Sequence, residues 1–252
     1  MVQRSLSIIV LVLFLLLGGL ISGCRGTADF IAQLHLGKGC EFFDQGYYDE
    51  AVEEFSKATV LNPNLAEAYG NRAATYLEMG HYNLTIADCN KAIEFNPGDA
   101  VPYGIRAAAH IKLEQYYQAI ADCDKAIQHN RGLAKAYHTR GLAYYRLGQY
   151  PQTIADTSKA VVLEPNLVPA YNTRGVTYST LGEYAKAVAD FNKAIELNPN
   201  YSEAYYNRGL AYKAQGKKAE AIADFEKFLS LNDILNLEWI EMAEQWIEEL
   251  SR

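Results

Sequence analysis

Several hallmarks of catalytic and metal-binding proteins are missing from this chain of 252 residues. Its four cysteines and five histidines form neither a CxxC nor an HxxxH spacing, so no metal site of the zinc type is expected. No Gly-rich phosphate loop, Ser-His-Asp arrangement or pair of catalytic carboxylates is evident, and the histidines are scattered. We therefore expect no enzyme activity, no cofactor, no metal and no small-molecule substrate.

Positive charge is also scarce. The chain has 23 Lys and Arg residues against 30 Asp and Glu residues, a formal net charge of −7. Proteins that bind nucleic acids present basic stripes, and anionic lipid headgroups attract clusters of basic residues. The acidic excess argues against both kinds of partner.

What the chain does contain is a 34-residue pattern that fills residues 32–235 without interruption. Its six copies are 32–65, 66–99, 100–133, 134–167, 168–201 and 202–235. Position 8 of each copy is always small: Gly39, Ala73, Ala107, Gly141, Gly175, Gly209. Position 24 is bulky or of medium size: Phe55, Cys89, Cys123, Thr157, Phe191, Phe225. A fixed period of this length is typical of a solenoid.

The spacing inside each copy predicts two helices. Positions 4, 8 and 11 share one face of a first helix, and positions 20, 24 and 27 share one face of a second. Small residues at positions 8, 20 and 27 let the two backbones approach closely. Glycines fall where the first helix must end: Gly46, Gly80, Gly148, Gly182, Gly216. Asn-Pro pairs end the second helix, because proline disfavours a helical residue before it.

This pattern resembles the tetratricopeptide repeat, a helix–turn–helix unit of 34 residues. The resemblance implies an all-α, right-handed α-solenoid of six such repeats. A C-terminal capping helix is expected over 236–252, where apolar residues share one face: Trp239, Ala243, Trp246, Ile247, Leu250. The alternative for this tail is an amphipathic helix that binds a partner.

The N-terminus reads as a leader. Arg4 precedes an apolar run from Leu6 to Ile21, which is short for a membrane-spanning helix. The stretch Ile21-Ser22-Gly23-Cys24 resembles the lipobox of bacterial lipoproteins. This resemblance implies cleavage of residues 1–23, lipid chains on Cys24 and a short linker over 24–31.

Such a protein would be tethered on the extracytoplasmic side of a bacterial cell envelope. By the resemblance to bacterial lipoproteins, Arg25 after the cysteine implies sorting to the outer membrane if the organism has two membranes. Loss of Arg4 with the leader lowers the basic count from 23 to 22 against 30 acidic residues, a net charge of −8. An uncleaved signal-anchor and an ordinary secretory signal remain alternatives.

Two charged positions recur in the repeats. Position 7 is Lys or Arg, and position 23 is Asp or Glu, in all six copies. We interpret these residues as ion pairs between the two helices of each copy, because a binding site would vary from copy to copy. The alternative is a ladder of charges for a ligand. Cys89 and Cys123 occupy one core position and are expected to be buried and unpaired.

In tetratricopeptide proteins, positions 2, 5, 9, 12 and 13 line a concave groove. Carried over residue by residue, they predict a basic centre with neighbouring apolar and polar side chains: Lys112, Lys135, His138, Leu142, Tyr145, Arg146, Asn172, Tyr206. They also predict an acidic end: Asp44, Glu67, Glu78. The hypothesis is a groove for a peptide or helix that carries an acidic group; the alternative is a solvated face without a ligand. The residues that form a carboxylate clamp in chaperone-binding repeats do not occur at the required positions.

The sequence therefore favours a membrane-tethered scaffold or assembly factor that binds a protein or peptide. A holdase that tolerates many peptide sequences is the alternative. The oligomeric state stays open.

Overall fold

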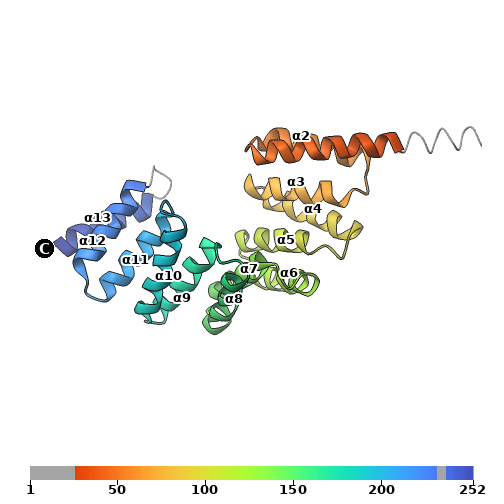
Figure 1. The fold of residues 1–252 in the computed structure, drawn as a ribbon. Coiled ribbons are helices and arrows are strands. Elements are labelled where there is room, and N and C mark those ends of the chain that lie inside the picture. Colours follow the sequence, from red (N-terminus) through yellow and green to blue (C-terminus); the bar gives the residue numbers. More distant parts are fainter. Residues whose placement is uncertain (1–25, 232–236, 252) are drawn as a thin grey trace, which may run out of the picture. The chain divides into compact units, whose positions relative to one another are not determined.

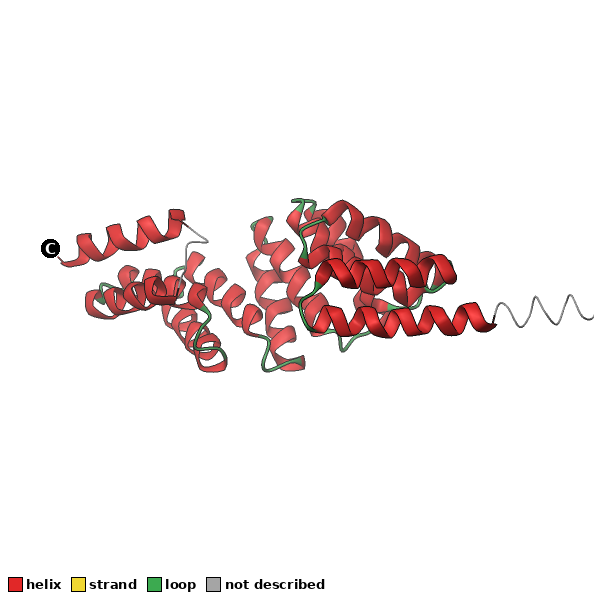
Figure 2. Ribbon diagram, turned by 90° about the horizontal axis from the view of Figure 1, so that it is seen from above, coloured by secondary structure: helices red, strands yellow, loops and turns green. Residues whose placement is uncertain are grey.

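The computed structural model of the chain describes residues 26–231 and 237–251, so the predicted leader and Cys24 lie outside the described residues. Within the described ranges the elements are helices joined by short turns, without a strand (Figure 2). A helix over 26–44 comes first. It is followed by the helices labelled in Figure 1: α2 (Tyr48–Leu61), α3 (Ala66–Glu78), α4 (Tyr82–Phe95), α5 (Ala100–Lys112), α6 (Tyr116–His129), α7 (Ala134–Arg146), α8 (Tyr150–Leu163), α9 (Val168–Thr180), α10 (Tyr184–Leu197), α11 (Ser202–Ala214), α12 (Lys218–Leu231) and α13 (Leu237–Ser251).

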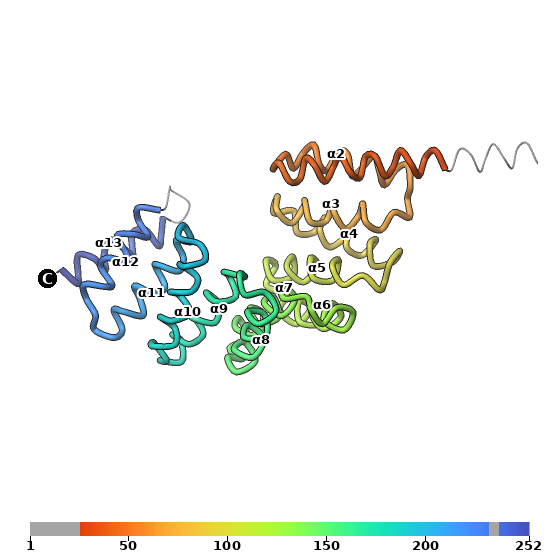
Figure 3. Tube along the Cα trace, in the orientation of Figure 1, coloured from red at the N-terminus to blue at the C-terminus, as the bar shows by residue number. Residues whose placement is uncertain are grey.

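The chain divides into two compact units, residues 1–109 and residues 110–252. Unit 1 holds the first helix, α2 to α4 and most of α5, and unit 2 holds the last turn of α5 and all later helices. In both units, helices that follow one another in the sequence pack side by side as antiparallel hairpins, and each hairpin packs on the next (Figure 3). The prediction of an all-α solenoid of helix–turn–helix repeats is confirmed. The first helix already includes residues 26–31, so the linker expected over 24–31 is not a separate element among the described residues.

Positions 8 and 24 of a copy pack directly against each other. A Cβ atom added to Gly175 would lie 2.6 Å from Cε1 of Phe191, and one added to Gly209 would lie 2.8 Å from Cε1 of Phe225. The copies with Ala at position 8 instead have the smaller Cys at position 24. The two positions therefore share one volume, which keeps the helices of each hairpin at a close distance.

Cys89 and Cys123 fill this position as fully buried thiols that form no disulfide, as the sequence predicted. Burial raises the pKa of the Cys123 thiol well above its ordinary value. Both residues act as small core side chains.

The turn inside each hairpin requires a left-handed residue. The five glycines predicted to end the first helices have φ between 73° and 80°, which confirms their role. In the third copy the same position is Glu114, with φ 60°, and it is the one non-glycine residue with positive φ in the described ranges.

Replacing Glu114 by glycine is expected to stabilise the protein. A side chain in the left-handed region costs about 1 kcal/mol, part of which is returned because glycine is freer in the unfolded chain. The free energy of unfolding in urea should rise by roughly 0.5–1 kcal/mol. Glu114→Ala is the control, and equal stabilisation by alanine would show that the carboxylate, and not the backbone, is responsible.

The charged positions 7 and 23 form the expected ion pairs. In four copies an Arg donates through Nε and Nη2 to both oxygens of an Asp on the second helix, at 2.6–2.9 Å: Arg72–Asp88, Arg140–Asp156, Arg174–Asp190, Arg208–Asp224. The carboxylates are buried and the guanidinium groups are mostly so. Such bidentate pairs are geometrically specific. The ladder is structural within each copy.

The same four arginines and Arg106, which occupies position 7 of the third copy, also connect neighbouring copies, which the sequence analysis did not predict. Through Nη1 they donate to a polar side chain on the second helix of the preceding copy, at 2.5–3.1 Å: Ser56, Asn90, Asp124, Ser158, Asn192. The guanidinium carbon of each lies 5.5–5.7 Å from the ring of the Tyr at position 4. The recurring Arg and Tyr thus hold together both a hairpin and its neighbour.

The first copy has Lys38 and Glu54 in place of this pair. Glu54 accepts hydrogen bonds from His35 at 2.6 Å, Lys57 at 2.8 Å and Lys38 at 3.3 Å. Burial by itself would raise the pKa of Glu54, but the hydrogen bonds from Lys57, His35 and Lys38 lower it to about 2.

Unit 1 should therefore lose stability in acid through Glu54. The folded-state pKa lies below the value of about 4.3 that glutamate has in an unfolded chain. Its contribution is present above about pH 4.3 and disappears as the pH falls toward 2. Glu54→Gln should flatten the fall of the unfolding free energy over this window, whereas the exposed neighbour Glu53→Gln should not. The measurement is urea unfolding at a series of pH values, and parallel curves for wild type and Glu54→Gln would contradict the assignment.

Candidate functional site

A cavity of about 510 Å³ in unit 2 is the main candidate for a binding site. We call it the unit 2 pocket. Its lining comes from α5, α7, α9, α11, α13 and the turn before α11: Lys112, His138, Leu142, Tyr145, Arg146, Pro169, Asn172, Thr173, Val176, Tyr201, Glu203, Asn207, Trp239. Six of the eight residues predicted for the basic centre meet here. A second hollow of about 310 Å³ shares Val176 and Asn207 with it and continues along α9 and α11.

Two basic residues at the C-terminal ends of helices line the unit 2 pocket. Lys112 is the last residue of α5, and Arg146 is the last residue of α7. Cations are favoured at helix C-termini by the helix dipole. Leu142, Tyr145 and Val176 add apolar surface to the same lining.

His138 lies in the pocket but adds no positive charge near neutral pH. Its Nε2 atom is 3.1 Å from Oγ1 of Thr173 on α9. Burial lowers the pKa of His138 to about 4. The prediction that His138 belongs to the basic centre is therefore corrected: near neutral pH it is a neutral hydrogen-bonding group.

Part of the pocket lining is joined by a chain of hydrogen bonds. Asn207 donates through Nδ2 to Asn172 Oδ1 at 3.1 Å, and Asn172 donates to Glu203 Oε2 at 3.4 Å. The Tyr201 hydroxyl donates to the same carboxylate oxygen at 2.8 Å, and burial together with Glu203 raises the pKa of Tyr201 well above its ordinary value. Asn172 is therefore a positioned wall residue. Glu203 occupies groove position 2 of the sixth copy and adds an acidic charge to the lining that contains Lys112 and Arg146.

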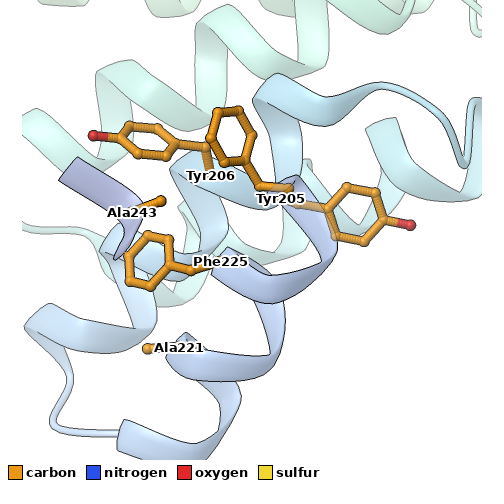
Figure 4. Packing of buried hydrophobic residues seen from close by; sticks show 6 residues of the cluster. Tyr205, Tyr206, Ala221, Phe225 and Ala243 are labelled. Carbon is orange, nitrogen blue, oxygen red and sulfur yellow. The ribbon is translucent and has the colours of Figure 1, made fainter. Parts of the chain in front are cut away.

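Two predicted residues do not line the pocket. Lys135 lies exposed in the first turn of α7. Tyr206 is only 4% exposed, because its ring stacks on Trp239 of α13 at 4.8 Å with an interplanar angle of 12°. Figure 4 shows Tyr206 and Phe225 together with Ala243 of α13, whereas the ring of Tyr205 points the other way.

The helix α13 thus packs on three groove positions of the last copy: Tyr206, Leu210, Lys213. Ala243 is fully buried against the cluster that contains Phe225 and Phe228. Lys213 lies 3.2 Å from the ring centre of Trp246. The helix behaves as the capping helix that the sequence predicted, and it also contributes Trp239 to the pocket lining.

The predicted acidic end belongs to unit 1. Asp44 borders a smaller cavity of about 200 Å³, together with Cys40, Phe43 and Asn71. Burial raises the pKa of the Cys40 thiol, and Glu67 and Asp44 raise it further, so these two carboxylates lie near the same sulfur. Glu78 is exposed at the end of α3 and lines no cavity described here.

Over residues 26–231 and 237–251, no cluster of His, Cys, Asp and Glu suits a metal ion. Among the helices of these same ranges, none combines the length and the apolar character needed to cross a membrane.

Sequence comparison finds tetratricopeptide repeats in both halves of the chain. A model described as "TPR repeat" matches residues 39–80 and 178–216, and one described as "Tetratricopeptide repeat" matches 66–99 and 202–233. Among curated proteins, no sequence is significantly similar to this chain.

Solved structures show the same fold. The Cut9–Hcn1 hetero-tetramer of the APC/C has a chain that is similar over 92% of this one, with a TM-score of 0.79 and 18% identity; the match spans 47% of that longer chain. PilW, described as a type IV pilus biogenesis factor, gives a TM-score of 0.73 and 15% identity over 88% of this chain and 99% of its own. YrrB, described as a TPR protein with an unusual peptide-binding site, gives a TM-score of 0.55 and 22% identity over 77% of this chain and 99% of its own. The chain therefore carries tetratricopeptide repeats and has the helical solenoid fold of tetratricopeptide repeat proteins, which are generally protein–protein interaction scaffolds.

Proposed function

We propose that this protein is a membrane-tethered scaffold or assembly factor that binds a peptide or helix of a partner protein in the unit 2 pocket. The observation that carries this proposal is that Lys112 and Arg146 line one pocket together with apolar and aromatic side chains. A cavity of about 510 Å³ is large enough for a few side chains of a peptide.

The chemistry of the lining specifies the ligand. Lys112 and Arg146 would pair with a carboxylate of the ligand, and Leu142, Tyr145 and Trp239 would contact an apolar or aromatic side chain beside it. Glu203, in the same lining, would accept a hydrogen bond from a ligand N–H or cation. The ligand segment is thus acidic toward α5 and α7 and a hydrogen-bond donor toward α11.

Two further observations support the proposal. YrrB, a solved relative in fold, is described as having a peptide-binding site, and PilW is described as a pilus biogenesis factor. The lipobox-like stretch that ends at Cys24 supports a lipid tether on the extracytoplasmic side of the cell envelope. Several acyl chains on one cysteine would give a stable anchor.

The test is a cross-linked pull-down from native membranes with the double variant Lys112→Glu, Arg146→Glu. Its matched control is Lys135→Glu, Lys159→Glu, which makes the same charge change at two exposed residues outside the pocket. We expect one or a few partners to be captured by wild type and by the control, and to be depleted roughly tenfold by the pocket variant, as loss of a charged contact implies.

If both variants retain the partners, the unit 2 pocket does not bind them. A long and unspecific set of captured proteins, unchanged by either variant and insensitive to salt, would instead favour the holdase.

A further inference from the structure

The first helix carries a bare apolar patch at its N-terminal end. Phe30 is 65% exposed, Leu34 is 57% exposed and Ile31 is 42% exposed. The opposite face of the helix is buried in unit 1 through Ala32 and Leu36. The three exposed side chains therefore lie on the side that no described part of unit 1 covers.

The patch occupies only the first turns of the helix. Phe30 and Leu34 are one turn apart, and Ile31 lies beside them on the same side. Farther along this side come Lys38 and Glu41, which are exposed and charged. Lys38 pairs with Glu54 and lies over the ring of Phe42.

The change from apolar to charged side chains along the helix indicates what kind of partner could cover the patch. A second copy of the chain, stacked along the helix, would need apolar contacts over most of its length. A surface that meets only the end of the helix needs apolar side chains only there. The observed pattern fits an end-on surface.

A lipid bilayer would be such a surface, and the predicted lipid anchor, Cys24, lies close to the patch in the sequence. Phe30 follows Cys24 by six residues, so the two are separated by no more than about 20 Å even if the chain between them were extended. If Cys24 is lipidated, its acyl chains hold this end of the helix at a bilayer.

We propose that Phe30, Ile31 and Leu34 insert into the membrane surface beside Cys24. The contact rests on the proposed lipid tether for its position, but its chemistry is that of the patch alone. It is hydrophobic and does not require anionic lipid, since the chain is acidic overall. It would hold unit 1 against the bilayer, so that the anchor fixes the direction of the first hairpin.

The experiment is flotation of residues 24–252 bearing Cys24→Ser, which lacks the leader and the lipid but keeps every described residue. The probe is vesicles of pure phosphatidylcholine. We expect the protein with the wild-type patch to float measurably with the vesicles, and 0.5 M NaCl should not reduce this flotation. The triple variant Phe30→Ser, Ile31→Ser, Leu34→Ser should lower the vesicle-bound fraction at least tenfold. The matched control is Val60→Ser, Tyr117→Ser, Val162→Ser, three apolar residues elsewhere that are 72–78% exposed and so more exposed than the patch, which should float as wild type.

Equal flotation of the patch variant and wild type would overturn the inference. So would loss of flotation in salt, which would indicate an electrostatic contact. A wild-type dimer in sedimentation velocity without vesicles, abolished by the patch variant, would assign the patch to a second copy. Because Lys112→Glu, Arg146→Glu should float as wild type, this test is separate from that of the pocket.

Discussion

Asp190→Ala is expected to lower the free energy of unfolding by about 3–5 kcal/mol, the usual cost of removing one partner of a buried ion pair. The side chain of Asp190 is 10% exposed and that of Arg174 is 17% exposed. Asp190 accepts from Arg174 Nε at 2.8 Å and from Nη2 at 2.7 Å, so its removal leaves two guanidinium donors unpaired in a mostly buried place. The remaining contacts of Arg174, to Ser158 and to the ring of Tyr171, cannot replace a carboxylate.

The matched control is Glu196→Ala in the next turns of the same helix. Glu196 pairs with Lys193 at 2.6 Å, but the two side chains are 68% and 38% exposed. An exposed pair of this kind contributes less than about 1 kcal/mol. Urea unfolding followed by circular dichroism at 222 nm measures both, and similar losses for the two variants would contradict a structural role for the recurring ladder.

Gly175→Ala is expected to destabilise the protein by roughly 1–3 kcal/mol, the range found for overpacked cores. The new methyl group would lie 2.6 Å from Cε1 and 2.9 Å from Cδ1 of Phe191, a fully buried ring. In an open helix position the same substitution stabilises by about 0.5–1 kcal/mol, because alanine loses less backbone freedom on folding. Gly70→Ala provides this control, since its nearest neighbour outside the helix backbone would be Pro102 Cγ at 3.9 Å. One substitution should thus have opposite signs at two helical glycines.

A second-site change distinguishes overpacking from other effects of the methyl group. Adding Phe191→Cys to Gly175→Ala recreates the pairs Ala73–Cys89 and Ala107–Cys123 found in other copies. The double variant should be more stable than the sum of the two single losses predicts, because the alanine fills part of the volume that the ring vacates. Additive losses in thermal and urea unfolding would contradict the shared volume.

The sequence predicts the fold because most of it is local and repeated. The glycines at positive φ, the helix ends at Asn-Pro pairs and the pairing of positions 7 and 23 follow from residues within one copy. The link from each Arg to the preceding copy involves a position that is Ser, Asn or Asp, so no single residue type marks it in the sequence. The only sequence signal for this link is that position 25 is polar in each of these copies.

The site is less predictable because it depends on helices from several copies. The placement of α13 on α11 buries Tyr206 and brings Trp239 to the pocket, and no repeat position encodes that contact. Burial makes His138 neutral, which a count of basic residues misses. Lys112, Leu142, Tyr145 and Arg146 line one cavity, because the lining positions of a helix face follow from spacing alone.

These features give the unit 2 pocket a specific chemistry. Its lining combines two cations at helix ends, a hydrogen-bonded carboxylate and aromatic side chains. A solvated face without a ligand would not be expected to bring these groups together around one cavity. A holdase that tolerates many sequences would be expected to have a broader apolar surface.

The most direct measurement is a selection of random 12-residue peptides displayed on phage, with wild-type protein as bait and Lys112→Glu, Arg146→Glu in a parallel selection. The account predicts that wild type enriches peptides in which Asp or Glu adjoins an aromatic or aliphatic residue, and that the variant loses them. Enrichment of basic peptides by wild type, or the same acidic peptides from both baits, would contradict a peptide-binding role for the unit 2 pocket.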